Sequence, residues 1–189
     1  VRCFTCPVDA GLLKREASLV SKLVQIREGE PLSSTQLKSL VQLADTTLST
    51  QHWVTAGLRD AFAQTILASG GGDGGGLVEA ATALEEYVKA WRSHKTSFGC
   101  GAYLTIAWRL ERAGDCYAAC GMVVEACGCY LEARAEVARL GLEPEEEEGE
   151  SKKKKKAGGG GAVSEDGRAG AIEAKLRAMM IRGGGVEVT

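Results

Sequence analysis

The sequence has no long apolar run and no excess of charge of one sign. Glycines and charged residues interrupt every longer apolar segment, so none approaches the roughly 18–20 residues needed to span a bilayer. The 25 acidic and 23 basic side chains nearly cancel, and at the level of the whole chain nothing predicts a nucleic-acid or membrane partner by electrostatics. We therefore expect a soluble folded part without an integral membrane segment.

Groups typical of active sites are scarce. The chain has 2 histidines, His52 and His94, and neither stands in a recognised motif with a serine, a cysteine or a carboxylate. Glu85 and Glu86 are neighbours in a predicted helix, where adjacent side chains point about 100° apart. We expect them to face solvent rather than to act as an acid/base pair. The sequence thus predicts no enzyme activity, no catalytic residue and no cofactor.

An initial methionine is also missing. The chain begins Val1-Arg2-Cys3, and no basic segment followed by an apolar one comes next. We therefore expect either a processed protein or a fragment whose targeting segment is missing.

Cysteine, by contrast, is abundant, with 7 residues in a chain of 189. An odd number of thiols, in a chain with enough core to fold without crosslinks, favours reduced cysteines over a disulfide framework. Cys3 and Cys6 have the spacing of half a zinc site, but neither the later cysteines nor the histidines supply a second half. We predict no metal site, and we expect Cys116 and Cys120 to pack on one helix face as small hydrophobes.

The remaining composition is that of a globular chain with a polar tail. Apolar residues make up 44% of the sequence, which suffices for one ordinary core. We predict an all-α fold in which an antiparallel helical bundle over 11–92 is extended over 99–142 by tetratricopeptide-like helices, forming one domain, 11–142. A disordered linker over 143–168 and a short C-terminal helix over 169–183 are expected to follow.

Two helices are predicted at the start of the bundle. The first spans 11–28, before Gly29, with a buried stripe at spacings i, i+4, i+7 and i+11. The second begins with a capping box, in which Ser33 and Gln36 each satisfy a backbone N–H of the other. The expected buried residues are Leu13, Ala17, Val20 and Val24 in the first helix, and Leu37, Leu40, Val41, Ala44 and Leu48 in the second.

Two further helices are predicted over 52–68 and 77–92. A short joint before the third helix favours an antiparallel pair, and we expect Trp53 to be the packing anchor of this hairpin. The glycine run over 70–76 lacks the side chains and the preceding strand of a phosphate-binding loop, so we interpret it as a flexible linker. The expected inward residues are Val54, Leu58, Ala61, Phe62 and Ile66, then Leu77, Ala81, Leu84, Val88 and Trp91, with Tyr87 in the core or at its rim.

These segments carry a resemblance to a known domain. Its elements are the Gly29-Glu30-Pro31-Leu32-Ser33 entry, the leucines from Leu37 to Leu43, the His52-Trp53 pair ahead of Ala61-Phe62, and the helix over 84–91. Over residues 16–92 they resemble the C-terminal helical domain shared by the steroid receptor RNA activator protein and the outer-coat scaffold subunit of the COPII vesicle coat. The resemblance implies a role in coat assembly during transport from the endoplasmic reticulum. The glycine run and the later helices depart from the family pattern.

The region 101–142 has a pattern of its own. Gly114 precedes Tyr117 and Gly128 precedes Tyr130, and each glycine is predicted to permit a tight turn at the start of a new helix. The pattern resembles the helix-turn-helix repeats of tetratricopeptide and clathrin-like solenoids, and further helices of one bundle are the alternative. The expected inward residues are Tyr103, Ala107, Leu110, Ala113, Ala133, Val137 and Leu140.

The tail changes composition abruptly. Glutamates over 145–148 are followed by the lysines Lys152, Lys153, Lys154, Lys155 and Lys156. With no apolar residues to offset the cost of ordering, this block is predicted to be disordered. Two interpretations of these lysines stay open, a nuclear-import or nucleic-acid patch and a solvated linker. The upstream glutamates favour the linker, because their negative charge offsets much of the positive field of the lysines. The last helix is expected to dock to the body or to a partner.

A helical scaffold or adaptor is the predicted function, with helical protein partners, in the cytoplasm at endoplasmic reticulum exit sites and in COPII coat assembly. One alternative is an RNA-binding or co-regulator component of a ribonucleoprotein complex in the nucleus. Another is an accessory subunit of an organellar complex. The candidate packing or partner-binding residues are Trp53, Phe62, Trp91, Tyr117 and Tyr130.

Overall fold

The computed structural model describes residues 10–70, 74–93, 101–140 and 165–183, and within these ranges the chain is helical and contains no strand. The helices are α1 (Ala10–Arg27), α2 (Ser34–Thr47), α3 (Trp53–Ala68), α4 (Gly74–Ser93), α5 (Gly101–Ala119), α6 (Val123–Ala138) and α7 (Glu165–Gly183). The predicted all-α fold is confirmed. None of the described helices is long and apolar enough to cross a membrane.

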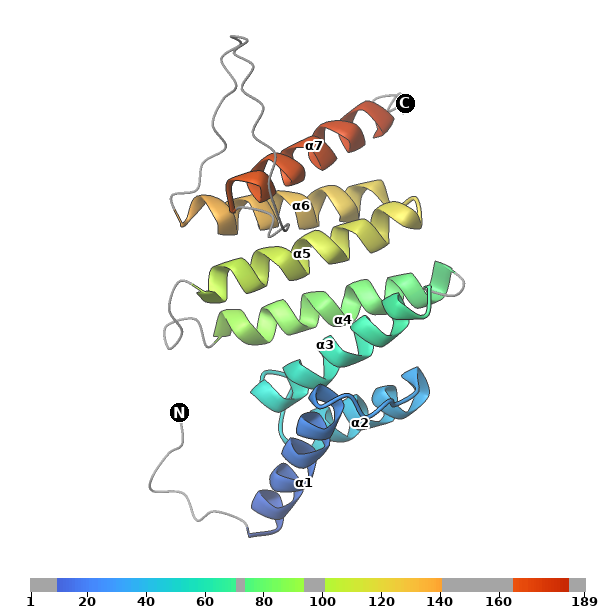
Figure 1. Cartoon of the computed structure of the whole chain (residues 1–189), viewed down its shortest axis with the longest axis vertical. Helices are drawn as coiled ribbons and strands as arrows, with labels where there is room; N and C mark the ends of the chain where they lie inside the picture. The colour runs from blue at the N-terminus through green and yellow to red at the C-terminus, as the bar shows by residue number, and fades with distance from the viewer. Residues whose placement is uncertain (1–9, 71–73, 94–100, 141–164, 184–189) are drawn as a thin grey trace, which may run out of the picture.

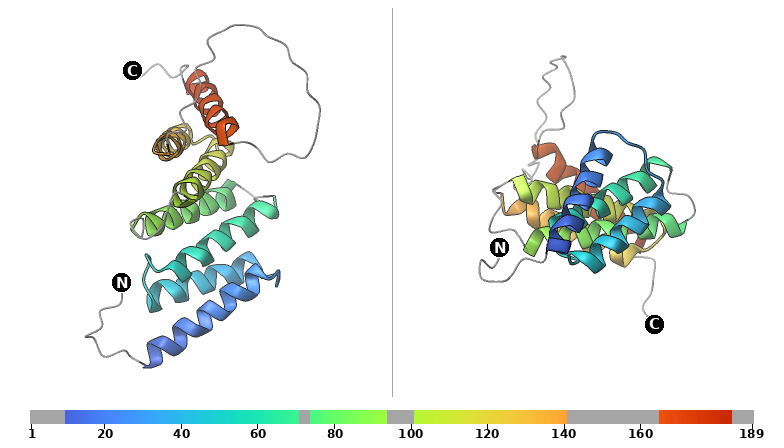
Figure 2. Two further views of the ribbon diagram at one scale, coloured as in Figure 1. Left: turned by 60° about the vertical axis from the view of Figure 1, so that its left-hand side comes forward. Right: turned by 90° about the horizontal axis from the view of Figure 1, so that it is seen from below.

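The helices form a stack that follows the order of the chain (Figure 1). From α2 onward each helix packs on the next, whereas α1 lies against both α2 and α3. The left view in Figure 2 shows the same order, from α1 at one end to α7 at the other. One apolar cluster runs from Leu37 in α2 to Met179 in α7, and a smaller one joins α1 to α2 and α3 around Leu23 and Leu58. The predicted bundle over 11–92 therefore shares its core with the later helices.

The start of α2 is built as its sequence predicts. The backbone N–H of Gln36 donates to Ser33 Oγ at 3.2 Å, and the backbone N–H of Ser33 donates to Gln36 Oε1 at 2.9 Å. The box satisfies two donors that have no partner inside the helix. Its effect is to set where α2 begins.

The buried faces of α3 and α4 are also largely as predicted. Val54, Leu58 and Leu84 are fully buried, and Phe62 and Ile66 are each 7% exposed. The predicted linker is too long, however, because α4 already begins at glycine 74 of the 70–76 run. A thiol just after the end of α5 contacts this first turn, since Cys120 Sγ donates to the Gly74 carbonyl at 3.3 Å.

α1 is rotated about its axis relative to the prediction. Leu19 and Leu23 are its buried residues, at 3% and 2% exposure, while Leu13 and Val24 are 39% and 46% exposed. The rotation follows from Gly57 in α3, where a Cβ would come within 2.7 Å of Leu23 Cδ2, so the missing side chain lets that face of α1 approach α3. The predicted buried stripe Leu13, Ala17, Val20 and Val24 is therefore wrong, and only Val20 of these packs partly against the core.

The predicted turns at Gly114 and Gly128 are wrong. α5 continues through Gly114, α6 continues through Gly128, and the chain reverses instead at Gly121, whose φ is 75°. Gly114 serves close packing, because a Cβ there would come within 2.6 Å of the Tyr130 ring. The buried residues of these two helices nevertheless include the predicted Ala107, Leu110, Ala113, Ala133 and Val137.

The C-terminal helix α7 docks on α6, and its lysine reaches α5. Lys175 Nζ donates to Glu111 Oε1 at 2.7 Å and to Asp115 Oδ2 at 2.9 Å. Burial alone would lower the pKa of Lys175, but these two hydrogen bonds hold it above its ordinary value. The apolar contacts come from Ile172, Leu176 and Met179, all buried.

Because α7 begins at residue 165, the predicted linker over 143–168 is too long at its C-terminal end. Its remaining part, together with Lys152–Lys156, lies outside the described residues, as do Cys3, Cys6 and His94.

The carboxylates Glu85 and Glu86 are both partly buried, which contradicts the expectation that they face solvent. Tyr117 Oη donates to Glu85 Oε2 at 2.9 Å. Lys89 Nζ lies 2.6 Å from Glu86 Oε1, and Arg59 Nη1 lies 3.9 Å from Glu86 Oε2. Tyr117 of α5 and Arg59 of α3 thus join the two carboxylates of α4 to different helices, so Glu85 and Glu86 do not form a pair. Tertiary packing decided this, since Tyr117 and Arg59 are distant from α4 in sequence, whereas Lys89 belongs to α4 itself.

Candidate partner-binding cleft

A cleft rich in aromatic side chains lies where the C-terminal ends of α1 and α4 meet the N-terminal end of α3. Its volume is about 370 Å³. We refer to it as the aromatic cleft, and its lining residues are Arg27, Trp53, Ala56, Gly57, Tyr87, Ala90 and Trp91.

Trp53 forms one wall because of its place at the first position of α3. His52 caps this helix, with its Nδ1 accepting from the backbone N–H of Val54 at 3.3 Å, and the His52 and Trp53 rings lie 6.0 Å apart. Trp53 is 48% exposed, whereas Val54 and Leu58 are fully buried. The prediction that Trp53 is the packing anchor is therefore wrong: the residues after it turn into the core, and its own ring stays at the edge of the stack.

The opposite wall comes from α4, where Tyr87 and Trp91 are one helical turn apart. Their ring centroids lie 5.8 Å apart with the planes inclined at 41°. Burial, followed by the nearby Asp60 carboxylate, raises the pKa of Tyr87 to about 12. Its hydroxyl therefore keeps its proton near neutral pH and is able to donate a hydrogen bond.

A buried ion pair supports Tyr87 from α5 and α3. Arg109 Nε lies 2.6 Å from Asp60 Oδ1, and the arginine side chain is 10% exposed. The Arg109 guanidinium carbon is 5.6 Å from the centre of the Tyr87 ring and 4.0 Å from that of Trp108. The guanidinium thus lies within the distance of a cation–π interaction with the tyrosine ring.

Arg27 supplies the charge of the cleft. It is the last residue of α1 and forms no ion pair with a carboxylate among the described residues. Its position depends on Gly57, which lets α1 approach α3 closely enough to close this side. Aromatic walls beside an arginine suit an apolar side chain that is accompanied by a carboxylate.

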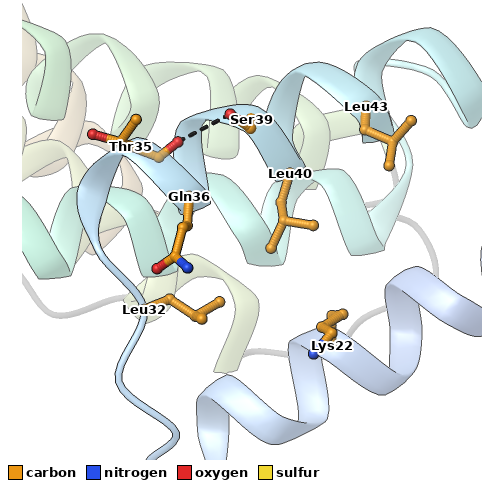
Figure 3. Close-up of a pocket in the computed structure, with 7 residues that line it drawn as sticks. All are labelled: Lys22, Leu32, Thr35, Gln36, Ser39, Leu40 and Leu43. Carbon is orange, nitrogen blue, oxygen red and sulfur yellow. Dashed lines mark hydrogen bonds between the residues drawn. The ribbon is translucent and has the colours of Figure 1, made fainter.

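Two further grooves lie on other faces of the stack. Figure 3 shows one between α1 and α2, of about 410 Å³, in which Leu32 and Leu40 project toward α1 and Lys22 lies across from them. The other, of about 310 Å³, lies between α2 and α4 above Phe62, and the Lys38–Glu79 ion pair of 2.8 Å is at its edge. Neither groove has more than one aromatic side chain in its lining.

The structure brings together only part of the predicted set of site residues. Trp53 and Trp91 share the aromatic cleft, and Phe62 lines the groove between α2 and α4. Tyr117 and Tyr130 are buried, at 6% and 2% exposure, and their hydroxyls donate to Glu85 and Asp115, at 2.9 and 2.7 Å. These two tyrosines are therefore packing residues in α5 and α6.

The sequence interpretation missed Arg27 and Gly57 as cleft residues. The sequence does contain a signal for Arg27. It follows Val24 by three residues and so continues the series Leu13, Ala17, Val20 and Val24 along one face of α1, which the structure leaves partly exposed. Gly57 carries no such signal, since a glycine within a helical pattern is equally compatible with close packing and with a local break.

Within the described ranges, no group of three or more His, Cys, Asp or Glu side chains is arranged to hold a metal ion. The described cysteines, Cys116, Cys120, Cys127 and Cys129, are free thiols. Cys116 is buried, as expected for a small hydrophobe, and Cys120 is partly buried. Comparison with protein-family models, with curated proteins and with solved structures finds no match for this chain.

Proposed function

We propose that this chain is a non-enzymatic helical scaffold that binds a segment of another protein in the aromatic cleft. The observation that carries the proposal is the 48% exposure of Trp53 in the wall of a cleft shared with Tyr87, Trp91 and Arg27. Tryptophan, tyrosine and arginine are the residue types that contribute most to binding energy at protein interfaces. A partly exposed tryptophan gains free energy when a partner removes its remaining apolar surface from water.

The shape and charge of the cleft define the partner segment. A volume of about 370 Å³ is at the small end of the range for ligand sites, roughly 300–1,000 Å³, and accommodates an anchoring side chain rather than a long peptide. Arg27 favours a carboxylate beside that anchor. A partner helix with a large apolar residue and an acidic residue one turn away meets both requirements.

The test is quantitative capture of proteins from native extract on the full chain and on Trp53→Ala. We expect the variant to lose the specific partner, and a matched Leu43→Ala variant to keep it, because Leu43 is 53% exposed on α2 and does not line the aromatic cleft. Equal capture by Trp53→Ala and the parent chain would contradict the proposal. The full chain is used because the core of the first helices continues into α5 and α6.

A narrower proposal, resting on the resemblance over residues 16–92, is that the captured partner is a component of the COPII coat. Enrichment of coat subunits that depends on Trp53 would support it, and their absence from a Trp53-dependent set would count against it. The RNA-binding alternative rests on Lys152–Lys156, which lie outside the described residues. It predicts binding that weakens steeply with salt and is lost when these lysines are changed to glutamine.

A further inference from the structure

The outward side of α6 is an apolar face that nothing in the described structure covers. Val124 is 81% exposed and Leu131 is 49% exposed. The exposed residues Gly128, Ala135 and Ala138 complete the same stripe, at spacings of four, three, four and three. This is the spacing with which one helix packs along another in a coiled coil.

The stripe is not needed to complete the fold of one chain. The opposite face of α6 carries Ala126, Tyr130, Ala133 and Val137, all buried in the main apolar cluster. Two large apolar side chains exposed along one stripe of small residues, on a helix that already has a full buried face, favour an interaction surface.

Gly128, in the stripe, has no explanation within one chain. Gly114 and Gly57 are required by close neighbours, and Gly29, Gly70 and Gly121 have positive φ. A Cβ at Gly128 would meet nothing within 4 Å, although glycine inside a helix costs about 1 kcal/mol relative to alanine. A helix approaching from outside would use the space that the missing side chain leaves.

The charges beside the stripe are complementary to a second copy of the same helix. Glu125 and Arg139 lie on the same side of the stripe and near its two ends, given about 100° per residue. When two such helices pair antiparallel about Leu131, Glu125 of each copy lies near Arg139 of the other. The Arg139 side chain is 55% exposed and its Nη1 is 2.9 Å from Glu136 Oε1, which leaves further guanidinium donors for a second carboxylate.

We propose that the chain forms a two-fold symmetric homodimer in which α6 packs antiparallel on α6 of a second copy. Leu131 of each copy meets at the axis, and Val124 of one copy faces Ala138 of the other. A two-fold axis makes such an interface isologous, so each charge pair occurs twice. The residues that line the aromatic cleft belong to α1, α3 and α4, which precede α6 in the stack (Figure 1), and the dimer therefore presents two clefts at once.

The first test is sedimentation equilibrium of the full chain in the presence of a reductant. We expect the mass to rise toward twice that of one chain with increasing concentration, and Leu131→Glu to remain at the mass of one chain. The matched control is Leu43→Glu, which changes a leucine of similar exposure on α2 and should still dimerise. A parent chain that stays monomeric, or a Leu131→Glu variant that dimerises like the parent, would overturn the proposal.

The second test fixes the geometry by exchanging charges. Glu125→Arg and Arg139→Glu should each weaken the dimer, and the double variant should restore it. Failure of the double variant to dimerise better than both single variants would reject the antiparallel arrangement about Leu131. The thermal unfolding midpoint of every variant is measured alongside, because Arg139→Glu also places a carboxylate near Glu136.

The dimer and the proposed binding function fail independently. Leu131→Glu should keep partner binding by each single chain, whereas Trp53→Ala should keep the dimer. If Leu131→Glu loses only the dimer and Trp53→Ala loses only partner binding, then dimerisation belongs to the α6 face and partner binding belongs to the aromatic cleft.

Discussion

The ring of Tyr130 in α6 lies directly over Gly114 in α5, so close that a Cβ on the glycine would be 2.6 Å from Tyr130 Cε1. The Tyr130 hydroxyl donates to Asp115 Oδ1 at 2.7 Å, and Lys175 Nζ of α7 lies 5.8 Å from the ring centre. This one contact therefore sets the distance between α5 and α6 and supports the docking of α7.

Gly114→Ala should destabilise the protein. The added methyl group forces the buried Tyr130 ring or one helix to move, which costs about 1–3 kcal/mol. Gly128→Ala is the matched comparison, because the same change there meets no neighbour and should stabilise the helix by about 1 kcal/mol. Urea unfolding of both variants in the Leu131→Glu background measures these effects without a contribution from dimerisation. A Gly114→Ala variant as stable as its parent would show that the close contact is not maintained.

Trp53→Ala should have only a small effect on stability. A buried tryptophan replaced by alanine costs about 3–5 kcal/mol, and for a ring that is about half exposed we expect roughly 1–2 kcal/mol. Leu58→Ala, at a fully buried position further along α3, should cost about 2–5 kcal/mol. Chemical unfolding curves separate the two cases. Equal losses would mean that Trp53 supports the core after all.

The stability of the fold should fall as pH rises above about 9. Burial, with the nearby Glu85 carboxylate, raises the pKa of the Cys129 thiol from 9.0 to about 12, and burial, with the Glu85 hydrogen bond, raises that of Tyr117 from 10.0 to about 12. Below its ordinary pKa each group is protonated in both states, and its contribution to stability is fully present. As pH rises from the ordinary pKa toward about 12, the group ionises in the unfolded chain while it stays protonated in the folded chain. The folded state therefore loses stability over this range.

Cys129→Ala tests the origin of this pH dependence. Removing the thiol should reduce the loss of stability between about pH 9 and pH 11 without abolishing it, because Cys116, whose pKa burial also raises, and the tyrosines still ionise first in the unfolded chain. Urea midpoints measured from pH 7 to pH 11 report the change. A loss as steep as that of the parent chain would assign it to groups other than Cys129.

Asp60→Asn should lower the pKa of Tyr87 and destabilise the fold. The carboxylate raises that pKa after burial does, so the tyrosine should ionise at a lower pH, as followed by ultraviolet absorbance. The change also leaves the buried Arg109 without its carboxylate, and breaking such a pair costs about 3–5 kcal/mol. Asp45→Asn is the comparison, because Asp45 pairs with Arg59, with Nη2 2.7 Å from Oδ1, and is not among the groups that act on Tyr87. A tyrosine titration that does not differ between the two variants would contradict the assignment.

Local chemistry explains which features the sequence predicted well. Ser33 and Gln36 are three residues apart and satisfy one another, so no distant contact is needed to place the start of α2. The inward faces of α3 and α4 follow from helical periodicity. Both helices carry many apolar residues, and neighbouring helices cover a broad side of each, so most of the positions predicted to face inward are buried.

The failures share a different cause. Both apolar faces of α1 have helical spacing, and the contact at Gly57 decides that Leu23 rather than Val24 is buried. Gly114 resembles a turn residue in sequence, yet its function is to admit Tyr130 from another helix. The size of the Trp53 ring favoured burial in the sequence interpretation. A ring at the start of a helix is buried only where another element covers it, and none of the described helices covers Trp53 fully.

The sequence by itself determined the helical character of the chain, most helix ends up to residue 93 and the polar or apolar character of each face, because these depend on residues within a few positions of one another. The tertiary structure alone decided which of several apolar faces are covered. Burial depends on contacts between helices distant in the chain, and these contacts leave Trp53 in a cleft and the Val124–Leu131 face of α6 open to solvent.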